Sequence, residues 1–295
     1  MNPKETKLQT LPMLVIVIVL VALAAAVSGC VTGERSDNLT DDQTEQIRVA
    51  VSILPQKEFV ERVGGDKVSV MVMIPPGASP ATYEPSPSQL REIAVAKLYV
   101  RIGHVPFEKA WMERIASANR DMLIIDSSVG IEIIGKDPHI WLSPTLVKVQ
   151  VGHICDALVE VDPDNRDYYV RNKEKYRTEL DDLDYDIRES LSGVTNRKFM
   201  VFHPAFGYFA RDYQMEQIPI EIEGKEPSAS DLVRLVDVAR TNNITVVFAE
   251  PQFNPEGAEV IASEIGGTVV FIDPLAEDFV TNMHRISDAL ARHTR

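Results

Sequence analysis

Two histidines and one aspartate stand close to the ends of strand-like segments, where their side chains could bind a metal ion. His203 follows the apolar run KFMVF, Asp273 closes the run TVVFID, and His139 lies in the loop sequence KDPHIWLSP. Two imidazoles and a carboxylate form a ligand set that suits a borderline divalent metal, zinc first, with manganese or iron(II) as alternatives. The residue types therefore predict a metal site, provided that the fold brings the three side chains together.

Strand-like and helix-like segments alternate through most of the chain, a pattern typical of βα units around a mainly parallel sheet. The predicted strands cover residues 47–54, 67–74, 97–103, 122–128, 198–202, 218–222, 244–250 and 268–273. We therefore expect an α/β fold of two Rossmann-like lobes. Ligands of open α/β sheets bind beyond the carboxyl ends of the strands, so we expect the three side chains to converge on a cleft between the lobes.

Residues 162–193 interrupt this alternation and predict one long amphipathic helix. Asp162 is the expected N-cap, and Pro163 occupies the first helical position. The apolar residues recur three, four or seven positions apart, over too short a distance for a sustained coiled coil. We interpret the helix as a rigid link between an N-terminal lobe of residues 47–161 and a C-terminal lobe of residues 194–295.

The first thirty residues have the features of a targeting signal. Two lysines precede an apolar run over residues 11–27, which ends in the sequence VSGC at Cys30. We predict a signal peptide over residues 1–29, a lipid anchor on Cys30 and a polar tether up to residue 46. The alternative is that the N-terminal helix is retained as a transmembrane anchor. Both interpretations place the protein outside the cytoplasm and anchored to the cell membrane.

Composition and charge are those of a globular protein with little affinity for nucleic acid. The 295 residues are 45% hydrophobic and 25% charged, and the formal net charge is -14. A surface of this sign repels phosphate groups and mildly favours the collection of cations.

Seven phrases in residues 47–280 resemble those of one known family. They are ILPQKEFVERVGGD, PPGASPATYEPSPSQL, DPHIWLSP, FHPAFGYFARDY, IEGKEPSASDL, FAEPQFNPEGAEVIASEIGG and IDPLAED. The family is that of the zinc and manganese solute-binding lipoproteins of ABC importers, called cluster A-I or TroA-like. The resemblance implies two α/β lobes, a rigid linking helix and one transported metal ion in the cleft. It also implies delivery to a membrane permease powered by an ATPase, and no enzymatic activity; we expect a monomer.

The resemblance places the second, third and fourth metal ligands of the family on His139, His203 and Asp273. A histidine in the third place resembles zinc-binding members, because manganese-binding members usually carry glutamate there. The first ligand of the family is normally a histidine, but this chain has Ala81 at that position. Alanine cannot coordinate a metal, so the expected four-ligand site is incomplete.

Several interpretations of Ala81 stay open. Water, Glu84 or His104 could complete a zinc site, or the cleft could serve another substrate or weaker capture. An open coordination position is also how catalytic zinc is presented, and Glu250 would be the candidate general base of a zinc-dependent hydrolase. An adhesin or sensory lipoprotein on the same scaffold is a further alternative.

Overall fold

The computed structural model describes residues 46–222 and 224–294. The predicted signal peptide over residues 1–29, the lipid anchor at Cys30 and the tether, apart from Gln46, lie outside the described residues. Within the described part of the chain, none of the helices combines the length and apolar character that crossing a membrane requires.

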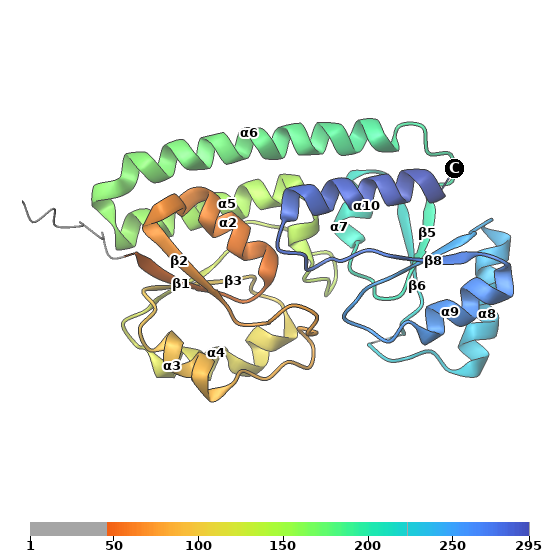
Figure 1. Ribbon diagram of the computed structural model, residues 1–295, viewed down its shortest axis with the longest axis horizontal. Helices are drawn as coiled ribbons and strands as arrows, with labels where there is room; N and C mark the ends of the chain where they lie inside the picture. Colours follow the sequence, from red (N-terminus) through yellow and green to blue (C-terminus); the bar gives the residue numbers. More distant parts are fainter. Residues whose placement is uncertain (1–45, 223, 295) are drawn as a thin grey trace, which may run out of the picture. The chain divides into compact units, whose positions relative to one another are not determined.

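The first half of the chain forms a four-stranded parallel sheet with the strand order β2-β1-β3-β4 (Figure 1). Its strands are β1 (Ile47–Val51), β2 (Val68–Val72), β3 (Leu98–Arg101) and β4 (Leu123–Asp126). The two central strands, β1 and β3, are the most deeply buried, as expected for a parallel sheet that helices cover.

The second half repeats this topology in a sheet with the order β6-β5-β7-β8. Its strands are β5 (Lys198–Val201), β6 (Glu216–Pro219), β7 (Val246–Ala249) and β8 (Thr268–Phe271). The prediction of two α/β lobes with parallel sheets is confirmed, and each predicted strand overlaps an observed one.

Helices connect the strands and cover the sheets (Figure 1). The first sheet is accompanied by α2 (Leu54–Gly64), α3 (Pro87–Ile93), α4 (Pro106–Ala118) and α5 (Pro144–Val161), with short 3-10 turns η1 (Gly65–Lys67) and η2 (Ile140–Leu142). The second is accompanied by α7 (Gly207–Asp212), α8 (Ala229–Thr241), α9 (Glu256–Ile265) and α10 (Phe279–His293). Serine caps several of them: Ser143 accepts from the backbone N–H of Leu146, and Ser228 from that of Asp231.

The long helix α6 (Arg166–Leu191) follows a 3-10 turn, η3 (Pro163–Asn165). At about 1.5 Å per residue its 26 residues extend about 39 Å. The predicted apolar stripe is the buried one: Tyr169, Tyr176, Leu180, Leu183, Ile187 and Leu191. Asp162 precedes the helical turn that Pro163 opens, as predicted, but its side chain makes no capping hydrogen bond to the backbone of η3. The Asp162 carboxylate instead accepts from the Asn165 amide and the Tyr169 hydroxyl, at 2.7 and 2.6 Å.

The last helix, α10, packs against α6 and reaches the first half of the chain (Figure 1). The rings of Phe59 and Phe279 meet edge to face with centroids 5.1 Å apart. The backbone N–H of Phe279 also donates to the Glu58 carboxylate at 2.5 Å, and Lys57 pairs with Glu277. The helix therefore joins the two halves through both apolar and polar contacts.

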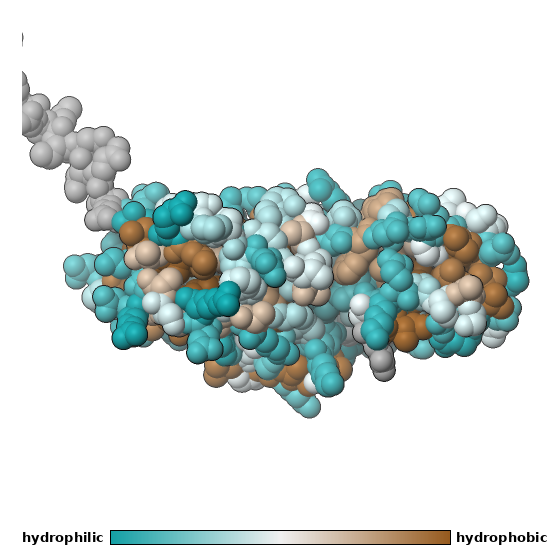
Figure 2. All heavy atoms as spheres, turned by 90° about the horizontal axis from the view of Figure 1, so that it is seen from below, coloured by the Kyte–Doolittle hydropathy of each residue, from teal (hydrophilic) through white to brown (hydrophobic). Residues whose placement is uncertain are grey.

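On the side of the molecule seen in Figure 2, hydrophobic residues form separate patches among hydrophilic ones. Apolar surface scattered in this way among polar residues is normal for a folded protein.

Candidate metal site

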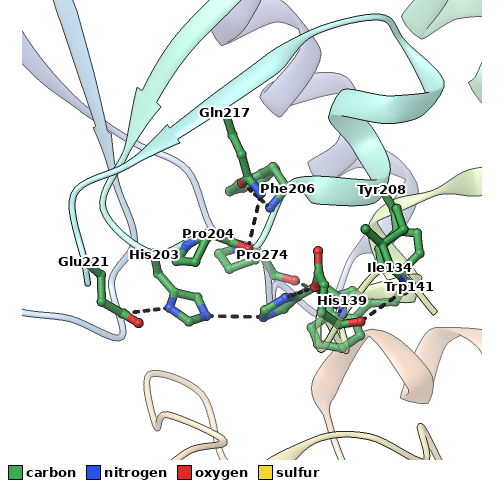
Figure 3. Close-up of polar contacts among 11 residues, drawn as sticks. Ile134, His139, Trp141, His203, Pro204, Phe206, Tyr208, Gln217, Glu221 and Pro274 are labelled. Atoms are coloured by element: carbon green, nitrogen blue, oxygen red, sulfur yellow. Dashed lines mark hydrogen bonds and ion pairs between the residues drawn. The ribbon is translucent and has the colours of Figure 1, made fainter. Parts of the chain in front are cut away.

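His139 and His203 come from different lobes and face each other. His139 lies between β4 and η2, and His203 is the second residue after β5. Their Nε2 atoms are 3.3 Å apart and their rings meet edge to face, as Figure 3 shows. The convergence of these two side chains, predicted from their positions near strand ends, is thus present in the structure.

A carboxylate lies behind each of these rings. His139 Nδ1 is 2.6 Å from Asp137 Oδ1, and His203 Nδ1 is 2.8 Å from Glu221 Oε2. Figure 3 shows Glu221 beside the His203 ring, on the side away from His139. Since a carboxylate accepts a hydrogen bond, it favours the tautomer with the proton on Nδ1. The Nε2 lone pair of each ring is then available, which is the arrangement typical of metal-binding histidines.

The separation of the two Nε2 atoms fits a shared metal ion. A tetrahedral zinc ion binds imidazole nitrogens at about 2.0–2.1 Å, which places two such nitrogens about 3.3–3.4 Å from each other. The observed 3.3 Å agrees with this spacing. Two facing lone pairs have no proton to share, so a cation between them would remove their repulsion.

Burial lowers the pKa of His139, although the nearby Asp137 carboxylate acts in the opposite direction. A lower pKa favours the neutral ring, which is the form that binds a metal.

The loops that carry the two histidines are held by contacts within and between the lobes. Tyr208 of α7 donates from its hydroxyl to the backbone carbonyl of Asp137 at 3.0 Å. Gly207 lets the Asp137 carboxylate approach this helix, because a Cβ atom at residue 207 would collide with it. Behind His203, Gln217 accepts from the backbone N–H of Phe206 at 2.9 Å.

Asp273 lies near the site, but its carboxylate is already engaged. Its Oδ1 accepts from the Gln252 side-chain amide at 2.7 Å and from the backbone N–H of Leu275 at 2.8 Å. Over residues 46–222 and 224–294, no three His, Cys, Asp or Glu side chains form a group that could hold a metal ion. The structure thus brings together His139 and His203, whereas the role of Asp273 stays a prediction.

A cleft of about 180 Å³ opens beside the two histidines. Its walls are largely apolar: Trp141, Phe253, Pro274 and Leu275 lie there with several other prolines and Val105. Ala81 and His104 also line it, whereas Glu84 does not. The Trp141 indole donates to the carbonyl oxygen of Pro274 at 2.8 Å, which links the two walls.

The proline-rich loop that carries Ala81 is well anchored although it lacks a donor. Ser86 caps α3, and the Gln89 side chain donates to the carbonyl oxygen of Met73 at 2.6 Å. Tyr83 donates to the Gln89 side chain at 2.7 Å. The frame of the loop is therefore fixed while its side chain at residue 81 is a methyl group.

Glu250 is unsuited to be the base of a hydrolase. The side chain is fully buried, and both of its oxygens accept from the backbone N–H of His203, at 3.2 and 3.3 Å. Burial raises the pKa of Glu250 to about 9, and the nearby carboxylates of Glu221 and Asp273 add to the rise. A carboxyl group that is protonated at neutral pH cannot accept a proton as a general base.

The sequence reasoning missed Asp137, Glu221 and Gln252. Asp137 stands two residues before His139, and a carboxylate so close to a candidate ligand is a usable signal. Glu221 lies just beyond the end of β6, at the same sheet edge as His203. No sequence signal ties Gln252 to Asp273, because their pairing depends on the packing of two loops.

Replacing Glu221 with alanine is expected to weaken zinc binding about 10-fold or more, because the His203 ring loses the group that fixes its tautomer and orientation. The dissociation constant can be measured by competition with a chromophoric chelator. Glu226→Ala is the control, because Glu226 is exposed and has no hydrogen bond to His203. Equal affinities of the two variants would contradict the role given to Glu221.

Comparison with known proteins places these features in context. A family model described as zinc-uptake complex component A, periplasmic, matches residues 49–293. The high-affinity zinc uptake system protein ZnuA of Bacillus subtilis is 30% identical over 262 residues, which cover 80% of each chain. The manganese-binding lipoprotein MntA of Halalkalibacterium halodurans is 27% identical, over 85% of this chain and 84% of its own. A crystal structure of ZnuA superimposes on this chain with a TM-score of 0.84 and 46% sequence identity. The superposition covers 85% of this chain and 100% of the ZnuA chain.

Proposed function

This chain belongs to the family of the zinc-uptake complex component A, and we propose that it captures a divalent transition metal outside the cytoplasm and delivers it to an ABC permease and its ATPase. The family is one of solute-binding proteins for metal uptake, not of enzymes. The hydrolase alternative gains nothing from the site, because Glu250 is fully buried, burial raises its pKa, and both of its oxygens accept from the His203 backbone N–H.

The observation that carries the proposal is the pair of imidazoles 3.3 Å apart, each with a carboxylate behind it. We assign His139 and His203 as metal ligands, with Asp273 as a further ligand. Asp273 would bind the metal through Oδ2, which has no hydrogen bond within the described residues, since Oδ1 accepts from Gln252 and Leu275. Two imidazoles with a carboxylate favour zinc over manganese as the cargo.

We also propose that the protein lies outside the cytoplasm, attached to the cell membrane. A signal peptide over residues 1–29 directs export, and Cys30 carries a lipid that anchors the chain to the cell membrane. The polar tether up to residue 46 then holds the two lobes, 47–161 and 194–295, and their linking helix, 162–193, near the permease. We propose a monomer, because the metal site lies within one chain. No feature of the described residues favours an adhesin or a sensory lipoprotein over a transport protein.

Metal analysis of the purified full chain tests the proposed cargo. After separate loading with zinc, manganese or iron(II) and removal of free metal, we expect about one equivalent of zinc per chain and less of the other two. The Ala81→His variant serves as a positive control, because it restores the missing donor. Less than about 0.1 equivalent of every metal in the natural chain, with full loading of the variant, would contradict the proposal.

A further inference from the structure

The segment that carries His104 is attached to the loop that carries Ala81. The backbone N–H of Phe107 donates to the carbonyl oxygen of Pro80 at 3.0 Å, directly before Ala81. The rings of Tyr83 and Phe107 also pack, with centroids 6.1 Å apart. These contacts hold the two loops together, and His104 and Ala81 line the same cleft.

The backbone beside His104 is fixed by a buried carboxylate. Ile102 and Gly103 donate their backbone N–H groups to Glu108 at 2.7 and 2.6 Å, and Glu108 is only 2% exposed. Gly103 has a φ of +98°, and a Cβ atom there would approach Asp126 Oδ1 to 2.6 Å. Since other residues would be strained at this φ, the glycine fixes the path by which the chain presents His104.

Within the part of the chain that the structure describes, the ring of His104 has no hydrogen-bond or ion-pair partner, unlike the rings of the other cleft histidines. His139 and His203 are bound by carboxylates through Nδ1. For His104 the structure gives no hydrogen bond or ion pair anywhere in residues 46–222 and 224–294. Both of its ring nitrogens are therefore available, and the side chain lines the same cleft as His139 and His203.

We propose that His104 supplies the imidazole that Ala81 cannot, so that zinc is held by three histidines and Asp273. This inference rests on the proposed function, because it concerns the same metal ion. His104 must move toward the other two rings, since the described residues contain no ready group of three ligands. Zinc provides the driving force, because metal binding and ordering of the ligands are coupled. The third imidazole would thus come from the loop of His104 and not from the loop of Ala81.

The test compares zinc affinity and the number of bound imidazoles in variants of the full chain. His104→Ala is expected to raise the zinc dissociation constant about 10- to 100-fold, the range known even for groups that only support a ligand. Adding Ala81→His to this variant is expected to restore the natural affinity, because a histidine at residue 81 makes His104 dispensable. X-ray absorption spectroscopy of the zinc complexes should count three imidazoles in the natural chain, two in His104→Ala and three in the double variant.

The matched control is His153→Ala. In the natural chain the His153 ring is hydrogen-bonded to the carbonyl oxygen of Val129 at 2.9 Å, and it does not line the cleft. This variant should bind zinc as the natural chain does. If His104→Ala keeps both the natural affinity and the natural imidazole count, His104 is not a ligand, although the proposed function stands. A double variant that fails to regain the third imidazole would also overturn the inference. Failure of the natural chain to bind zinc at all would instead overturn the proposed function.

Discussion

Replacement of His203 by alanine is expected to lower zinc affinity by more than about 100-fold, and His139→Ala should do the same. Either change leaves one imidazole where two meet at 3.3 Å, so the ion loses the pair of ligands that spans the lobes. Together the two replacements should cost less than the sum of their separate effects, because residues of one site are not additive.

A thermal unfolding assay makes this effect visible. At a zinc concentration of about 100 times the natural dissociation constant, binding stabilises the folded chain by about 2.7 kcal/mol. A 100-fold weaker variant at the same concentration retains about 0.4 kcal/mol. The zinc-induced rise in melting temperature should therefore nearly vanish. His284→Ala is the control, since that ring lies on α10 with 42% of its side chain exposed. An unchanged shift in His203→Ala would show that the metal site lies elsewhere.

The second large effect concerns stability. Phe279→Ala is expected to lower the free energy of unfolding by about 3–5 kcal/mol, because it opens a cavity where α10 meets Phe59 of α2. Phe279 is 1% exposed, so little of the lost contact can be replaced by water. Urea unfolding of the metal-free chain, followed by circular dichroism, measures the change.

Phe271→Ala is the matched control, because it removes the same side chain from a site that is 58% exposed. It should change the free energy of unfolding by less than about 0.5 kcal/mol. A cost for Phe279→Ala as small as that of the control would contradict the role of α10 in joining the two halves of the chain.

Much of the fold could be predicted because its signals are local. An apolar run of five residues such as KFMVF is enough to predict a strand. The apolar stripe that includes Tyr176 and Leu180 predicts a helix from a few turns of sequence. The start of the helical segment at Asp162 and Pro163 is also a local signal, although it does not say which groups the Asp162 carboxylate bonds. A carboxylate near a helix start can cap it or bond other side chains, and here the amide of Asn165 and the hydroxyl of Tyr169 are the partners.

The position of α10 could not be read from the sequence. The helix follows the last strand of the second lobe, yet Phe279 packs on Phe59 of the first lobe. An amphipathic stripe predicts that a helix buries one face, but it does not identify the part of the protein against which that face packs.

The sequence by itself determined the two-lobed α/β fold and the residue types near the strand ends, because hydrophobic periodicity and ligand chemistry are properties of short segments. It could name His139 and His203, but not the 3.3 Å between them. That distance, the carboxylates behind the rings, the engagement of Asp273 by Gln252 and the place of His104 beside Ala81 were decided by tertiary structure. Each depends on how loops from separate strands pack together, and such contacts leave no periodic signal in the chain.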